Sequence, residues 1–147
     1  MIFFCLSAGR LGFMRAVVAA LVFTTTLANA AEQFPYDQEL LLDAAPMRPG
    51  KRMPMLTVAP NGDAAIQLWC KDVPARVEVT DDAIKIEAAP LPDALPEMMS
   101  RDQCTPARLQ ADADLLAAIA QATAWQKQGS GLVLVGPQML KFRASDH

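Results

Sequence analysis

The sequence predicts an α+β fold, with a mostly antiparallel β-sheet arranged as a meander, one packed α-helix and one disulfide. Three observations lead to this fold class. Short segments that alternate apolar and polar residues fill the middle and the end of the chain, and one segment, "ADADLLAAIAQATAW", has helical periodicity. Two cysteines, Cys70 and Cys104, follow a removable leader, and an even number of cysteines in an exported protein favours a disulfide.

The leader contains "MRAVVAALVFTTTLANA", which reads as a secretory signal peptide. Arg15 supplies the positive start, a short apolar run follows, and Ala28-Asn29-Ala30 matches an A-x-A cleavage site. We therefore expect residues 1–30 to be a signal peptide that is cleaved after about Ala30. The apolar run is shorter than the roughly 20 residues of a spanning helix, so no stable membrane span is expected after cleavage, and an uncleaved anchor is the alternative.

Cleavage leaves residues 31–147, and these 117 residues suit one periplasmic domain with its core at about 38–143. Translation from either Met1 or Met14 gives the same mature domain. Removal of the two arginines in the leader leaves 11 Lys+Arg against 16 Asp+Glu, a net charge of −5. Nucleic acids and anionic lipids attract basic surfaces, so neither is expected as a partner.

The first half of the mature chain predicts a series of strands joined by tight turns. "QELLLDA" is a first strand, and "MLTVA" and "AAIQLWC" flank the turn "PNGD", in which Asn61-Gly62 supplies positive backbone angles. In the strand after this turn, alternation places Cys70 on the inner face and Trp69 on the outer face. "ARVEV" and "AIKIEA" continue the pattern on either side of "TDD", which completes an antiparallel meander with one solvated face.

The second half predicts a loop, the helix and three more strands. "APLPDALPEMMSRDQCTPA" carries four prolines and is interpreted as a long ordered loop. The helix is expected to take Asp112 as its N-cap and to present an apolar stripe that includes Leu115 and Ile119. "TAWQKQ" and "LVLVG" flank the turn "GSG", and in the last strand, "MLKFRA", Leu140 and Phe142 are expected to point inward.

Few residues are equipped for catalysis or metal binding. The one histidine, His147, is the last residue, which argues against histidine-based catalysis and an ordinary zinc site. Asp81-Asp82 lacks the ligand spacing of a calcium loop, so an ordinary turn is favoured over a metal site. We therefore expect no enzyme activity, no metal and no cofactor. Two interpretations stay open: Trp69 and Trp125 pack in the core or stack on a ligand, and Arg48, Lys51 and Arg52 form a solvated loop or contact an anion.

The two cysteines are 34 positions apart, so they do not form a C-x-x-C motif of the thioredoxin type. A disulfide between Cys70 and Cys104 would tie the proline-rich loop to the sheet. Closing a loop of this length restricts the unfolded chain by roughly 3.8 kcal/mol in the entropy model, a large share of the stability of a small domain. A disulfide is the favoured interpretation, and reactive thiols or metal ligands are the alternative.

The order of these elements resembles the META/HslJ-like family. The resemblance runs from about Leu40 to Phe142 and is carried by "LWCKDVPARVEVTDDAIKIEA", "RDQC", "LLAAIAQATAW" and "GLVLVGPQMLKF". Family members have a glycine-cysteine-asparagine segment before the meander; Trp69-Cys70-Lys71 stands there in this chain, and the family's usual tryptophan in the opening strand is absent. The resemblance implies a small domain of the bacterial envelope, associated with stress phenotypes, secretion or motility, without enzymatic activity and without assigned site residues.

These observations give two main functional expectations. The first is a non-catalytic exported domain that supports envelope integrity or the stress response by binding an envelope protein or a small ligand. The second is a small periplasmic inhibitor of a hydrolase that acts through the loop from Pro90 to Pro106. An enzyme that uses only Asp and Glu is a third hypothesis, and it requires acids that converge in a pocket.

Overall fold

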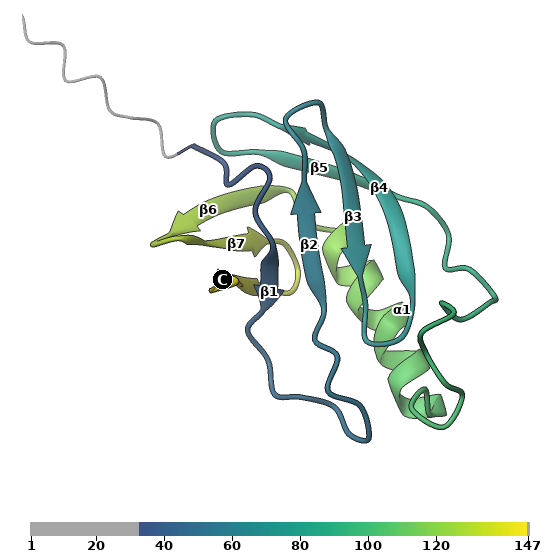
Figure 1. Ribbon diagram of the computed structural model, residues 1–147. Coiled ribbons are helices and arrows are strands. Elements are labelled where there is room, and N and C mark those ends of the chain that lie inside the picture. The colour runs from purple at the N-terminus through teal and green to yellow at the C-terminus, as the bar shows by residue number, and fades with distance from the viewer. Residues whose placement is uncertain (1–32, 147) are drawn as a thin grey trace, which may run out of the picture.

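The computed structural model describes residues 33–146, so the expected signal peptide at residues 1–30 and His147 lie outside the described residues. These residues form one antiparallel sheet of eight strands, in the order β5-β4-β3-β2-β1-β8-β7-β6, with a single helix (Figure 1). The elements are β1 (Leu40–Leu42), β2 (Met55–Val58), β3 (Asp63–Gln67), β4 (Asp72–Val79), β5 (Ile84–Ala88), α1 (Pro106–Ala120), β6 (Ala124–Gln128), β7 (Gly131–Val135) and β8 (Leu140–Ala144). Within this part of the chain, no helix is long and apolar enough to cross a membrane.

The sheet confirms the predicted antiparallel meander. Strands β2 to β5 pair consecutively, β6 to β8 do the same, and β1 joins the two groups by pairing with both β2 and β8. At the β2–β3 turn only Gly62 has a positive φ, 91°. Asn61 stabilises this turn through its side chain, because its Oδ1 accepts from the Asp63 amide at 3.0 Å.

The sheet curls until its two edges nearly meet, which the sequence did not predict. Ala83, just before β5, bridges to Ala124 in β6, and the Ile84 amide donates to the Thr123 carbonyl at 3.0 Å. The indole Nε1 of Trp125 donates to the Thr80 carbonyl at 2.9 Å across the same seam. These contacts cover part of the outer strands, whose free edges would otherwise be open to pairing with other chains.

The core lies inside this curled sheet and against one face of α1. Leu140 and Phe142 point inward as predicted, and both tryptophans, Trp69 and Trp125, lie in the core. The structure therefore supports packing as their role. The other fully buried apolar side chains come from most strands and the helix: Leu40, Leu56, Val58, Ile66, Leu68, Val73, Ile119, Leu132 and Leu134. Burying each of them contributes about 1.5–3 kcal/mol before conformational entropy is counted.

The helix begins at Pro106, six residues before the predicted N-cap, so the prediction for Asp112 was wrong. Thr105 is the N-cap, and its hydroxyl accepts from the Arg108 amide at 3.3 Å. Proline is well tolerated at the first helical position, where its missing N–H has no intrahelical partner to lose. The prolines of the preceding loop made "TPAR" look like more loop, and this displaced the predicted start.

Two glycines with positive φ give a matched test of the turns. A Cβ at Gly62 would lie 2.7 Å from the Val77 carbonyl oxygen, whereas a Cβ at Gly129, with φ 59°, would meet nothing within 4 Å. Gly129→Ala should cost about 1 kcal/mol of unfolding free energy, from backbone strain alone. Gly62→Ala should cost about 2–3 kcal/mol, because a steric clash is added. Urea denaturation measures both values, and equal losses would contradict the assigned geometry.

Candidate functional site

The turn between β3 and β4 is the centre of the candidate site. Strand β3 ends at Gln67, so Cys70 does not end a strand as predicted but lies in a tight turn. The Leu68 amide donates to the Lys71 carbonyl at 2.8 Å and closes this turn. Trp69 and Cys70 are both buried, so Cys70 lies inward as predicted, whereas the prediction that Trp69 lies on the outer face was wrong. The predicted alternation resumes in β4, where Val77 is buried and Glu78 is exposed.

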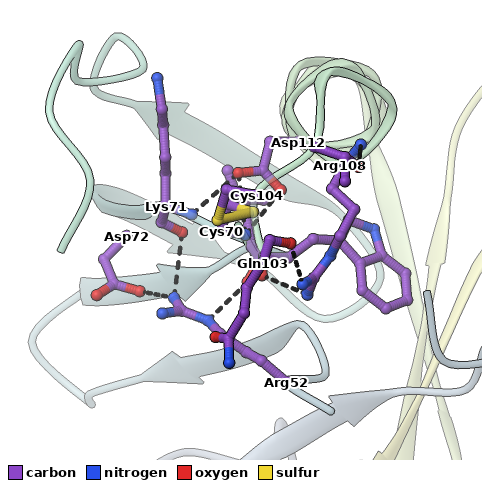
Figure 2. The surroundings of a disulfide bond; sticks show 11 residues. Arg52, Cys70, Lys71, Asp72, Gln103, Cys104, Arg108 and Asp112 are labelled. Atoms are coloured by element: carbon purple, nitrogen blue, oxygen red, sulfur yellow. Dashed lines mark hydrogen bonds and ion pairs between the residues drawn. A yellow bond between two sulfur atoms is a disulfide. The ribbon is translucent and has the colours of Figure 1, made fainter. Parts of the chain in front are cut away.

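Asp112 binds the backbone of this turn from the helix. Its carboxylate is fully buried and accepts from the Cys70 amide, 3.1 Å from each oxygen, and from the Lys71 amide at 2.9 Å (Figure 2). Burial raises the pKa of the Asp112 carboxyl above its ordinary value, while the hydrogen bonds from the turn amides act in the opposite direction. The carboxylate therefore supplies an acceptor to two backbone N–H groups that would otherwise be buried under the helix without one.

Arg108 lies one helical turn before Asp112 and is also fully buried. Its Nη2 donates to the Trp69 carbonyl at 2.9 Å, and its Nη1 donates to the Gln103 carbonyl at 2.7 Å (Figure 2). The guanidinium therefore links the β3–β4 turn to the end of the proline-rich loop. Gly50 packs against the same guanidinium, and a side chain at this position would collide with it.

Arg52 binds the turn from the opposite side. Its Nε donates to the Leu68 carbonyl at 3.0 Å, and it also donates to the Lys71 carbonyl and forms an ion pair with Asp72 (Figure 2). The interpretation of Arg48, Lys51 and Arg52 as one solvated loop is therefore wrong for Arg52. Arg48 and Lys51 are both exposed, which is compatible with either a solvated loop or an anion contact.

The predicted disulfide between Cys70 and Cys104 is present, with the two Cα atoms 5.8 Å apart. It joins the β3–β4 turn to the residue before the helix N-cap. The loop from 89 to 105, which we call the stapled loop, contains no helix or strand and runs beside the first turn of α1 (Figure 1). The disulfide and the Arg108–Gln103 hydrogen bond therefore fix the same end of this loop.

A cavity of about 580 Å³ opens beside the disulfide, and we call it the loop cavity. Lys71 lies at its wall and donates from Nζ to the Pro92 carbonyl at 2.6 Å, which holds the middle of the stapled loop near the turn. Two cationic and two acidic side chains line the cavity together with apolar ones: Lys71, Arg101, Asp93, Glu97, Ala94, Leu95, Pro96, Met99, Cys104 and Leu109. A cavity with this mixed lining suits an amphipathic group more than a simple ion.

The other candidate residues from the sequence are not brought together into a reactive centre. Asp81 and Asp82 lie in the β4–β5 turn, and the Asp82 carbonyl accepts from the Trp125 amide at 3.1 Å. Among residues 33–146, no group of three or more His, Cys, Asp or Glu side chains could hold a metal ion. Asp112 does not line the loop cavity and is fully engaged with the backbone.

Sequence reasoning missed Arg108 and Asp112, although the chain carries a signal for both. They precede Leu115 and Ile119 at spacings of four, three and four, which places all four on one face of a helix. A charged residue aligned with an apolar stripe is expected to be buried with hydrogen-bonding partners. Because the predicted helix began at Asp112, Arg108 lay outside the pattern.

Comparison with known proteins gives no match of the chain to any protein-family model, curated protein or solved structure.

Substitution of Asp112 tests its role in the turn. Asp112→Ala leaves the Cys70 and Lys71 amides without their acceptor and should lower the unfolding free energy by about 2–4 kcal/mol. Asp114→Ala is the matched control on the same helix, since Asp114 is exposed, and should change it by less than about 0.5 kcal/mol. Urea denaturation of both variants gives the values, and similar small losses would contradict the anchoring role.

The raised pKa of Asp112 predicts a distinctive pH dependence. The folded state holds this proton more tightly than the unfolded state, so the contribution of Asp112 to stability is largest below the unfolded pKa of about 3.9. It falls as the pH rises through the folded pKa and is constant above it. Asp112→Asn removes the titration, so the difference in unfolding free energy, wild type minus variant, should decrease across that window. A difference that grows with pH would contradict the assigned direction.

Proposed function

We propose that this chain is a non-catalytic exported domain that binds a partner protein through the face formed by the stapled loop and the loop cavity. The observation that carries the proposal is that this loop is long and irregular and yet is fixed at several points. It extends over 17 residues between β5 and α1 without a helix or strand. Loops of this length in a small domain are uncommon and often functional, and this one is held at defined points along its course.

Three contacts hold the stapled loop in one shape. Lys71 binds its middle through the Pro92 carbonyl, Arg108 binds its end through the Gln103 carbonyl, and Cys104 is covalently joined to the β3–β4 turn. A loop that is ordered before binding loses less conformational entropy when a partner docks. This arrangement favours a binding role over a simple connection between sheet and helix.

The stapled loop also presents an apolar side chain to solvent. Met98 is 93% exposed, and its neighbour Met99 lines the loop cavity. Methionine side chains are flexible and polarisable, and they adapt to the surface of a partner. Among the described residues, Met139 is the other exposed large apolar side chain, at 58%, and it lies in the turn before β8, outside the stapled loop.

The cellular setting of the proposal comes from the sequence. The predicted signal peptide supports export to the periplasm, and the META/HslJ-like resemblance supports a role in envelope integrity or the stress response. The meander, the two joined cysteines and the single helix follow the element order on which that resemblance depends. We propose membership of that family as a divergent branch, and an envelope protein as the partner.

An inhibitor of a cell-wall hydrolase is the second candidate function. The same observation favours it, because a stapled loop with an exposed apolar residue can enter an active-site cleft without being reordered. Titration of the purified domain into a panel of purified cell-wall hydrolases separates the two candidates. Inhibition that is lost in a Met98 variant supports this function, and the absence of inhibition leaves partner binding alone.

Substitution of Met98 tests the binding face. Met98→Asp should weaken binding to an envelope protein captured from periplasm at least about tenfold, because a charge replaces the exposed apolar side chain of the stapled loop. Met139→Asp is the matched control and should leave binding unchanged. Isothermal titration with the identified partner measures both affinities, and circular dichroism verifies that both variants fold. Equal affinities of the wild type and Met98→Asp would rule out this face.

A further inference from the structure

We propose that the Cys70–Cys104 disulfide is a redox-sensitive latch on the stapled loop, which a dithiol reductant opens while the β-sheet and the helix stay folded. The inference rests on the proposed function only for what the latch controls, which is the binding face. The structural part, release of the loop without loss of the fold, stands on the distribution of contacts around the two cysteines. These contacts are strong on the Cys70 side and sparse on the Cys104 side.

The Cys70 side is fixed without the disulfide. Asp112 holds the Cys70 amide, Arg108 holds the Trp69 carbonyl, and Arg52 holds the Leu68 carbonyl. These three side chains come from two different segments of the chain and converge on one four-residue turn (Figure 2). Cleavage of the S–S bond removes none of these hydrogen bonds, so the turn and the helix face are expected to stay in place.

The Cys104 side depends far more on the disulfide. The hydrogen bonds within the stapled loop are local, from the Met99 amide to Pro96 and from the Gln103 amide to Ser100. At its start, Ala89 donates to the Pro74 carbonyl at 2.9 Å, and Ala89 and Leu91 pack against the core. Beyond Leu91, its hydrogen bonds to the rest of the domain include one exposed bond from Lys71 and one from Arg108. Most of its side chains are exposed, and segments with few buried contacts open at low free-energy cost.

The geometry also indicates which of the two sulfur atoms, that of Cys70 or that of Cys104, a reductant attacks. Cys104 lines the loop cavity and is 6% exposed, whereas Cys70, in the β3–β4 turn, is fully buried. A thiolate of the dithiol attacks the Cys104 sulfur, the S–S bond breaks, and Cys70 leaves as a thiolate that takes up a proton. The second thiol of the reductant then attacks the mixed disulfide, frees Cys104 as a thiol and closes the reductant's own disulfide. Two electrons pass from the dithiol to the two cysteines.

Limited proteolysis of the oxidised and the dithiothreitol-reduced domain tests the latch. Arg101 is an exposed tryptic site in the stapled loop, and Lys51 is an exposed site in the loop before β2, which Arg52 ties to the turn. Reduction should speed cleavage after Arg101 at least about tenfold, because cleavage follows the population of the opened loop. Cleavage after Lys51 and the far-ultraviolet circular dichroism signal should not change.

Each other outcome overturns the latch. An unchanged rate at Arg101 means that the loop is held without the disulfide. Faster cleavage at Lys51 with loss of the dichroism signal means that the disulfide is required for the whole fold. A Cys70→Ala/Cys104→Ala double variant should behave like the reduced domain without any reductant, and this excludes a separate effect of dithiothreitol.

A monothiol identifies the sulfur under attack. Brief treatment of the oxidised domain with glutathione, followed by acid quenching and peptide mass mapping, should place the mixed disulfide on Cys104. A mixed disulfide on Cys70 contradicts the assigned direction of attack. None of these measurements uses a partner, so they succeed or fail independently of the Met98 binding test. If both hold, reduction should weaken partner binding at least about tenfold, as Met98→Asp does.

Discussion

The buried carboxylate of Asp112 is the contact on which the arrangement of sheet, helix and loop depends. It holds the amides of Cys70 and Lys71 and so fixes the β3–β4 turn against the middle of α1. Cys70 lies in that turn, so the position of the disulfide follows from it, and the end of the stapled loop follows from the disulfide. Without the carboxylate, the helix would cover backbone donors that have no acceptor, which is costly in a buried place.

The three charged side chains around the turn match the polarity of its backbone. Asp112 accepts from the N–H groups, while Arg108 and Arg52 donate to the carbonyl groups. Arg108 and Asp112 are four residues apart on the helix, but each binds backbone and not the other. A turn with both kinds of backbone group satisfied is a rigid support, and a covalent link attached to it can hold a loop in one position.

The sequence allowed the strands, the fold class and the disulfide to be predicted, because alternation at positions such as Leu140 and Phe142 and an even cysteine count are local signals. Closure of the sheet was not predictable, since the contact between Trp125 and Thr80 joins segments 45 positions apart. The site was missed because Pro106 was taken as the last proline of the loop, although it is the first residue of the helix. Arg108 then lay outside the helix, and Asp112 was taken for its cap when it is a buried ligand of the turn.

Hydrogen exchange of individual amides, followed by nuclear magnetic resonance, tests the central role of Asp112 most directly. The amides of Cys70 and Lys71 should exchange as slowly as those of the central strands, in both the oxidised and the reduced domain. In Asp112→Ala the same two amides should exchange much faster, while the strand amides stay protected. If the Cys70 and Lys71 amides of the wild type exchange as fast as the exposed Gly129 amide, the turn is not anchored and the account is wrong.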